Sequence, residues 1–350
     1  MNTDKSIDTS NMFQSIYEFP LQMKDAKLIG ENIKLNNTYS DAQNIVVCGM
    51  GGSAIGGDLS KSLVKKTLKL PLTVNRNYEL PNWVNSNSIV VCSSYSGNTE
   101  ESLNAYHNAI TKGAKVIGIT TGGELSFLLD KNNNDKVEIP SGLQPRAAVA
   151  FSFIPLLYLL KKLNLTESEA INDLAGTIEA LELARDLYSK SVDKNPTFNL
   201  AQKIYDTLPV IYGEDGSTSA IALRWKGQFC ENSKMLAYHN DIPEMNHNEI
   251  VGWQENPELL KKISILWISD KSINSRNSLR IDASNNILNK IPSLQQKIEV
   301  DGPNFTERFI HLLHFGDWVS YWCALLHSTD PSPVKKIDKL KKILSEKKLN

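Results

Sequence analysis

Short runs of apolar and β-branched residues alternate with longer helical segments along most of this chain. In the first half, these runs lie at positions 45–48, 72–75, 89–92, 116–119 and 137–139. Continuous apolar strands separated by helices are typical of a parallel sheet whose two faces are both covered. The alternation therefore predicts an α/β fold, with helices packed on both faces of a mainly parallel sheet.

The second half of the chain repeats the order of the first. Its strand-like runs lie at positions 208–212, 235–238, 263–268 and 297–300, and helical segments separate them. Two units with the same order of elements, each of about 150 residues, indicate a fold duplicated in tandem. We therefore expect two αβα sandwich domains in one chain.

Breaks in the patterns suggest the boundaries of these units. The apolar segment 147–163 is expected to close the first unit as a helix, and a capping box at Thr166 starts another helix that runs to about position 190. The polar stretch 191–199 then interrupts the pattern. In the tail, Ser332 as N-cap and Pro333 at the first helical position predict a final amphipathic helix. The expected parts are a helical leader over 1–40, a first αβα domain over 41–195 and a second over 196–350.

Charge and composition exclude several classes of protein. Lys and Arg number 38 against 39 Asp and Glu, so the chain lacks the broad basic field that nucleic acid or an anionic membrane would require. The longest apolar run, 147–160, is too short to span a bilayer, and the polar N-terminus does not resemble a signal peptide. The four cysteines are scattered, without the spacing of a disulfide framework or a zinc site. We expect a cytoplasmic protein that holds no metal or cofactor.

The first motif that points to chemistry is GMGGSAIGGD at positions 49–58, directly after the first predicted strand. It satisfies the dinucleotide-binding pattern G-x-G-x-x-[GA] in the correct strand-turn-helix context. The second strand, however, ends at Arg76 rather than at the acidic residue that NAD requires, so NADP remains the dinucleotide alternative. A third interpretation is that these glycines only allow a close approach of neighbouring strands.

The second motif is SSYSGNTEE at positions 93–101, which follows the third predicted strand and opens a helix. Hydroxyl groups together with free amides at a helix N-terminus suit a compact dianionic phosphate. A dinucleotide needs no second cluster of this kind, whereas a solvated turn capped by Ser96 and Thr99 is the plain structural alternative. We expect the phosphate ligands to be Gly52 and Ser53 from the first motif, and Ser94, Ser96 and Thr99 from the second.

These two motifs, followed by PRAA at 145–148, ENSK at 231–234 and NHNE at 246–249, resemble the sugar isomerase (SIS) fold of the bifunctional phosphoglucose/phosphomannose isomerases. The likeness covers most of the chain from about residue 40 onward. It implies two SIS domains, a homodimer, small-molecule sugar phosphates as ligands and a reversible aldose-ketose isomerisation without a metal. SSYSGNTEE by itself marks only the SIS superfamily, which also contains aminosugar isomerases and regulatory sugar-phosphate binders.

The resemblance also implies roles for individual residues. Glu231 corresponds to the base that moves the proton, although the sequence alone equally allows a surface pair with Lys234. Arg146 would be the cation near the enediolate oxygens. The alternative is that its side chain only covers the N-terminal edge of the next helix. An imidazole titrates near neutrality, so His247 suits ring opening, and the resemblance places it in the active site of the neighbouring subunit. Lys341 would assist at the ring oxygen, although lysines crowd its helix and such runs are usually solvated.

The expected activity is the interconversion of glucose 6-phosphate and fructose 6-phosphate through a cis-enediol. Mannose 6-phosphate is expected as a further substrate because the enediol is planar at C2 and its stereochemistry is lost there. A non-catalytic sugar-phosphate sensor would carry an additional DNA-binding or partner domain, and none is evident in 350 residues. Another SIS isomerase would usually lack both the ENSK and the NHNE elements.

Overall fold

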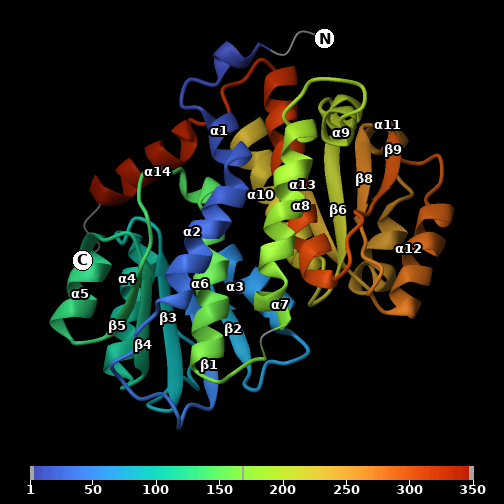
Figure 1. The fold of residues 1–350 in the computed structure, drawn as a ribbon. Coiled ribbons are helices and arrows are strands. Elements are labelled where there is room, and N and C mark those ends of the chain that lie inside the picture. Colours follow the sequence, from blue (N-terminus) through green and yellow to red (C-terminus); the bar gives the residue numbers. More distant parts are fainter. Residues whose placement is uncertain (1–3, 168, 347–350) are drawn as a thin grey trace.

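A computed structural model of the chain describes residues 4–167 and 169–346. Two parallel sheets lie side by side with helices around and between them, as Figure 1 shows. The strand pairs given for both sheets are all parallel, which confirms the predicted α/β fold with two αβα units.

The first sheet has five strands in the order β2-β1-β3-β4-β5. They are β1 (Asn44–Cys48), β2 (Leu72–Asn75), β3 (Ser88–Ser94), β4 (Lys115–Thr120) and β5 (Asp135–Glu138). Successive side chains of β1 enter different cores: Ile45 and Val47 belong to one, Val46 and Cys48 to the other. Burial of both faces explains why this strand is continuously apolar rather than alternating.

Six helices accompany this sheet, and the leader supplies two of them. They are α1 (Met12–Tyr17), α2 (Phe19–Glu31), α3 (Gly51–Val64), α4 (Glu100–Thr111), α5 (Gly123–Lys131) and α6 (Val149–Lys162). Helix α2 packs closely along α6, since a Cβ atom at Gly30 would lie 2.4 Å from the ring of Tyr158. Met23 of α2 is fully buried in the same core as the first sheet. The described part of the leader thus forms α1 and α2, and α2 is part of the first unit's core.

The second sheet has four strands in the order β7-β6-β8-β9. They are β6 (Leu208–Glu214), β7 (Tyr238–Ile242), β8 (Ile263–Ile268) and β9 (Leu294–Ile298). The predicted positions of β7 and β9, 235–238 and 297–300, were each wrong by about three residues. Both are edge strands with mixed, partly polar sequences, whereas the apolar Met235 and Ala237 are buried in the connection before β7. In these two segments the apolar residues therefore indicated burial and did not indicate a strand.

The helices that follow α6 correct two further boundaries. They are α7 (Glu169–Asn172), α8 (Leu174–Tyr188), α9 (Pro196–Ile204), α10 (Ser219–Gln228), α11 (Pro257–Leu260), α12 (Ser275–Ile287), α13 (Phe305–Leu326) and α14 (Lys335–Glu346). The single helix predicted over 166–190 is divided into α7 and α8. The tail helix begins at Lys335, so Ser332 is not its N-cap; the carbonyl of Ser332 instead accepts a hydrogen bond from Arg146, which holds this residue outside the helix.

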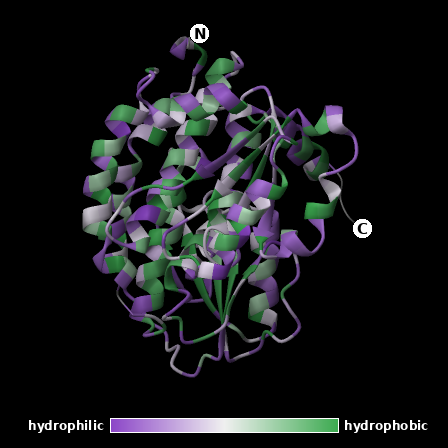
Figure 2. Cartoon of the chain, turned by 90° about the vertical axis from the view of Figure 1, so that its right-hand side faces the viewer, coloured by the Kyte–Doolittle hydropathy of each residue, from purple (hydrophilic) through white to green (hydrophobic). Residues whose placement is uncertain are grey.

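Helix α13 joins the two halves. It packs against α8, α9 and α10, and its residues share one hydrophobic core with β1 and α6 of the first half. In Figure 2 the hydrophobic residues are concentrated in the strands and in the helix faces turned toward them. Within the described residues, none of the helices combines the length and apolarity needed to cross a bilayer.

Candidate active site

The carboxyl ends of β1 and β3 lie next to each other where the strand order of the first sheet changes direction. Ligands of open α/β sheets bind in the crevice at such a point. The loop after β1 opens α3, and the loop after β3 opens α4. The N-cap residues Met50 and Thr99 make no side-chain capping bond, so both helices present free backbone N–H groups at this edge.

Glycines allow these loops to approach their neighbours. A Cβ atom at Gly49 would lie 2.9 Å from the Ser93 carbonyl oxygen, and one at Gly52 would lie 2.6 Å from the Pro145 carbonyl oxygen. Gly97 has φ +68°, a left-handed conformation that favours glycine. The interpretation that the glycines permit close packing is therefore correct for these positions. It is compatible with anion binding, because the same close approach exposes backbone amides.

The hydroxyl groups of the second motif lie at the same edge as the first motif. The Ser94 hydroxyl donates to Thr99 Oγ1 at 3.0 Å, and the Ser53 hydroxyl accepts a hydrogen bond from Tyr95 N at 3.2 Å. The second bond joins the two loops. Ser53 and Ser94 are buried, whereas Ser96 is exposed at the tip of the loop. The alternative of a turn capped by Ser96 and Thr99 is correct for Ser96, whose hydroxyl accepts a hydrogen bond from Asn98 N at 3.2 Å, and wrong for Thr99, which makes no capping bond.

Arg146 lies at the base of this region and is only 3% exposed, so it is not surface cover for α6. Its guanidinium donates to Asn232 Oδ1 at 2.6 Å and to the carbonyl oxygens of Pro331 and Ser332, both at 2.8 Å. The remaining Nη1 faces Glu231 Oε2 at 3.4 Å. Burial lowers the pKa of Arg146, and the Glu231 carboxylate opposes that shift.

Glu231 lies on a π-helical turn, Phe229–Ser233, that continues α10. Such turns insert one extra residue and are frequent at functional sites. The Glu231 side chain is 32% exposed and directs Oε2 at Arg146. The surface ion pair with Lys234 is absent from the described contacts, because the Lys234 ammonium donates to the Glu231 backbone carbonyl instead. The structure thus places Glu231 and Arg146 next to each other, and these are the two charged residues that the sequence analysis assigned to the centre of the reaction.

Buried polar residues on α10 and α13 hold this turn, and the sequence analysis missed them. Asn232 donates to Ser320 Oγ at 3.0 Å. Arg224 forms a buried ion pair with Asp317 at 3.0 Å, and it donates to the Arg146 carbonyl oxygen at 2.6 Å. Burial raises the pKa of Asp317, and Arg224 opposes the shift. A single acid inside the apolar stretch of α13 was the available signal, since such a residue must find a partner.

A cavity of about 130 Å³ opens between the first motif and the π-helical turn. Its lining residues come from the start of α3 and from α10, together with the charged groups described above: Gly51, Gly52, Ile55, Arg76, Arg146, Leu223, Arg224, Lys226, Gly227, Gln228 and Glu231. Arg76, which the NADP alternative required, is ion-paired with Asp58. Burial and the charges of Lys226 and Arg76, two of the lining residues, lower the pKa of His239 on β7.

The structure does not bring His247 and Lys341 to this cavity. His247 ends the short 3₁₀ helix Glu244–His247 and is exposed. Lys341 is exposed on α14, which lies at the outer edge of the molecule in Figure 1. Among the described residues, no hydrogen bond or ion pair links either side chain to Arg146 or Glu231. Their roles remain proposals.

A second, larger cavity of about 430 Å³ lies between the carboxyl edge of the second sheet and the end of α3. Glu214, Gly216, Ser272 and Asn274 contribute to its lining. It contains none of the residues that the sequence analysis selected. Over residues 4–167 and 169–346, no group of three or more His, Cys, Asp or Glu side chains is arranged to hold a metal ion.

Two family models match the chain. The SIS domain matches residues 38–132, and the bacterial phospho-glucose isomerase C-terminal SIS domain matches residues 193–344. The chain is therefore a protein with two SIS domains, one in each half.

Curated relatives define the family more closely. A bifunctional phosphoglucose/phosphomannose isomerase of Caldicellulosiruptor bescii is 45% identical over 96% of this chain and 99% of its own length. One of Aquifex aeolicus is 37% identical over 87% of this chain and 91% of its own length. The chain belongs to the bifunctional phosphoglucose/phosphomannose isomerase family, whose members are aldose-ketose isomerases.

Solved structures agree with the fold. The C-terminal domain of glucosamine-fructose-6-phosphate aminotransferase from Francisella tularensis superposes with a TM-score of 0.72 at 16% identity, covering 92% of this chain and 98% of that one. At this identity the likeness supports the arrangement of the two sheets.

Proposed function

We propose that this protein interconverts glucose 6-phosphate, fructose 6-phosphate and mannose 6-phosphate in one site that requires no metal. The observation that carries the proposal is the approach of Glu231 to the buried Arg146, 3.4 Å apart, beside two uncapped helix N-termini. A carboxylate, a fixed cation and an anion cradle are the three elements that this reaction on a phosphosugar requires.

The phosphate group would bind at the two loops of the first sheet. The hydroxyls of Ser96 and Thr99 can each donate one hydrogen bond, whereas Ser94 would donate to the phosphate only by giving up its bond to Thr99 Oγ1. The amides of Gly51 and Gly52 at the start of α3 add further donors, and Ser53 supports them with its own amide bonded to the Met50 carbonyl oxygen. Both helix dipoles attract the dianion. The loops would thereby fix one end of the sugar, so that its C1 and C2 atoms lie toward the cavity that Glu231 lines.

The Glu231 carboxylate would then move the proton between C2 and C1. Removal of the proton places negative charge on the C1 and C2 oxygens of the enediolate, and Arg146 is fixed by three hydrogen bonds before that charge develops. A preorganised cation in a buried position stabilises such a charge without reorganisation. Because the intermediate is planar at C2, return of the proton to either face gives the glucose or the mannose product.

Ring opening requires a further acid-base group, and we assign it to His247 of a second subunit. Within the chain, His247 is exposed and separate from Glu231, which is compatible with a role across a homodimer interface. Lys341 is proposed to assist at the ring oxygen. We also place the protein in the cytoplasm, a reducing compartment that suits four free cysteines, Cys48, Cys92, Cys230 and Cys323.

A coupled assay with each of the three sugar phosphates, before and after extensive treatment with EDTA, tests this proposal. We expect activity on all three, equal in both samples, and competitive inhibition of mannose 6-phosphate turnover by glucose 6-phosphate. Loss of the mannose activity alone on chelation would contradict a single metal-free site. Absence of activity on every substrate would overturn the proposed function.

A further inference from the structure

Lys234 ends the π-helical turn in a backbone conformation that side chains rarely adopt. Its φ is +58°, in the left-handed region. A residue other than glycine pays a conformational cost there, and such costs persist only where surrounding contacts determine the geometry. The contacts of the Lys234 side chain are therefore expected to explain this backbone conformation.

The Lys234 ammonium connects two distant segments of the chain. It donates to the carbonyl oxygen of Glu231 and, at 2.9 Å, to that of Pro331, 97 residues away. Arg146 donates to the same Pro331 oxygen at 2.8 Å. Two cations thus converge on one carbonyl group and tie the tail segment before α14 to the turn that carries Glu231.

This convergence is electrostatically unfavourable. The charged groups that face Lys234 are Arg146, Asp330 and Glu231; burial and the Arg146 charge lower its pKa to about 8, while the two acids oppose the shift. A bond from a lysine to the carbonyl three residues earlier is a common helix C-cap. A simple cap would need neither the Pro331 contact nor the neighbouring arginine.

We propose that Lys234 is a positioning residue, which holds the backbone of Glu231 and the Pro331 segment in one arrangement so that the carboxylate meets the substrate correctly. This inference rests on the proposed isomerase function. Because Lys234 would act through Glu231, its loss should slow the reaction step rather than weaken substrate binding. A misplacement of a catalytic group by about 1 Å can reduce a rate 100-fold.

The test compares two lysines with the same backbone conformation. Lys234→Asn removes the ammonium but tolerates the left-handed region. Lys290→Asn is the matched control, because Lys290 has φ +66° and is exposed, as Lys234 is, but no described hydrogen bond or ion pair links its side chain to the turn that carries Glu231 or to the Pro331 segment. We expect Lys234→Asn to lower kcat at least about tenfold with KM changed less than about threefold, and Lys290→Asn to change neither. Lys234→Arg should restore part of the rate. Where kcat of the wild type falls near pH 8, the fall in Lys234→Arg should occur at a pH higher by about one unit or more, since arginine keeps its charge.

Hydrogen exchange of the full chain tests, independently of activity, whether Lys234 holds the Pro331 segment in place. The amide of Ser332, which donates to Asp330 Oδ1 at 2.9 Å, should exchange faster in Lys234→Asn than in the wild type or in Lys290→Asn. A wild type inactive on all three sugar phosphates would overturn the proposed function. An active wild type with normal kcat in Lys234→Asn, or unchanged exchange at Ser332, would overturn the inference about Lys234.

Discussion

The loops at the carboxyl edges of the two sheets satisfy their hydrogen-bonding groups in different ways. At the first edge, the loops carry glycines and hydroxyls, and the helices α3 and α4 begin without side-chain caps. At the second edge, the Glu214 carboxylate accepts hydrogen bonds from Asn274 N at 3.0 Å and Asn277 Nδ2 at 2.8 Å. Asp270 accepts from the amide of Ser272 and pairs with Arg308.

The difference shows how one duplicated fold can give a single site. Where backbone donors are free, an external anion can bind to them. At the second edge α10 also begins without a side-chain cap, but the Glu214 carboxylate accepts bonds from the neighbouring loop, and its charge repels a second anion there. We therefore expect the substrate phosphate at the first edge only, and substitutions in the candidate site and at the second edge should have very different effects.

The carboxylates Glu231 and Glu214 give the sharpest contrast. Glu231→Gln keeps the shape of the side chain but removes the proton acceptor, so kcat should fall about 10²- to 10⁴-fold on both aldose substrates. Glu214→Gln retains the hydrogen-bond acceptor of the second edge and should leave kcat almost unchanged. Steady-state assays of both variants check this. Near-normal turnover by Glu231→Gln would show that Glu231 is not the base.

The second edge should matter for stability instead. The Asp270 side chain is 1% exposed and pairs with Arg308 at 2.6 Å. Arg308→Met leaves that carboxylate buried without its cation, and we expect a loss of about 3 to 5 kcal/mol in the free energy of unfolding. Denaturant unfolding measures the loss, while kcat of the folded fraction should not change. A variant as stable as the wild type would show that the second edge is not held by this pair.

The hydroxyls test where the phosphate binds. Replacing Ser96 and Thr99 by Ala should mainly raise KM, because each hydrogen bond to a charged group contributes about 1.5 to 3 kcal/mol. A pair of serines in loops of the second edge, Ser217 and Ser272, should have little effect on KM when replaced by Ala. Equal KM values for the two double variants would mean that the comparison of the edges is wrong.

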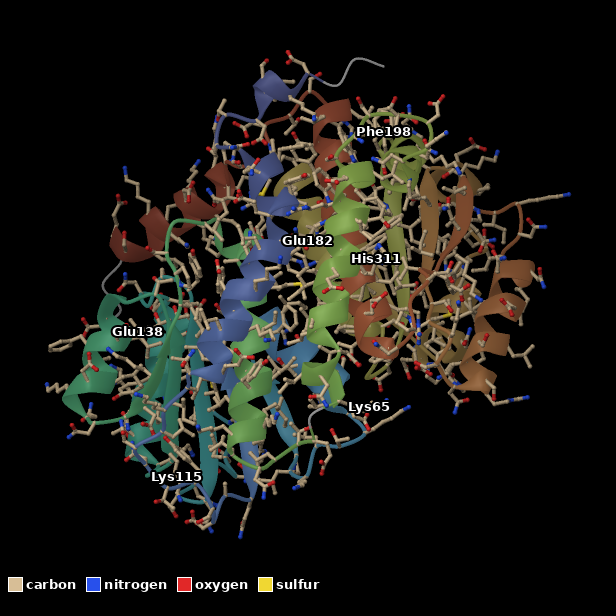
Figure 3. The ribbon with its side chains drawn as sticks, viewed as in Figure 1. Lys65, Lys115, Glu138, Glu182, Phe198 and His311 are labelled. Carbon is tan, nitrogen blue, oxygen red and sulfur yellow. The ribbon has the colours of Figure 1, made fainter. Side chains whose placement is uncertain are left out.

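The packing of α13 against α8, where the two halves meet, should lose stability at acidic pH. His311 of α13, labelled in Figure 3, bonds to the Tyr188 hydroxyl at 2.8 Å, and burial lowers its pKa from 6.5 to about 4. Between these values the unfolded chain binds more protons than the folded one, so stability is lost as the pH falls from about 6.5 toward 4.

For His311 alone this loss amounts to about 2 kcal/mol at pH 5. The dependence on pH between 7 and 5 should therefore be weaker in His311→Gln than in the wild type. The exposed His107→Gln is the control and should behave as the wild type does. A pH dependence unchanged in His311→Gln would show that the buried imidazole is not the cause.

The sequence predicted the central parts of both sheets well, because a fully buried strand such as β1 or β8 is continuously apolar. It placed β7 and β9 about three residues away from their true positions, because edge strands permit polar side chains. The glycine and hydroxyl motifs were identified because strand, turn and helix follow each other locally there. That local context is sufficient to predict an anion site.

The support of Glu231 could not be predicted in the same way. Arg146 and Asn232 are 86 residues apart, and Lys234 and Pro331 are 97 apart, so only the fold brings these partners together. Lys234 was considered only as a surface partner of Glu231, since a pattern of charges at helical spacing contains no information about a π-helical turn. Asp317 within the apolar α13 was the one visible sign of a buried polar network.

Isomerisation in D₂O tests the central claim most directly. Fructose 6-phosphate is incubated with the enzyme, with and without EDTA, and NMR follows deuterium at C2 of the glucose 6-phosphate and mannose 6-phosphate that form. The account predicts label at C2 of both products in the wild type, equal in the two samples, and loss of both signals in Glu231→Gln. Label that persists in Glu231→Gln, or a mannose signal that disappears only with EDTA, would contradict a single metal-free site with Glu231 as its base.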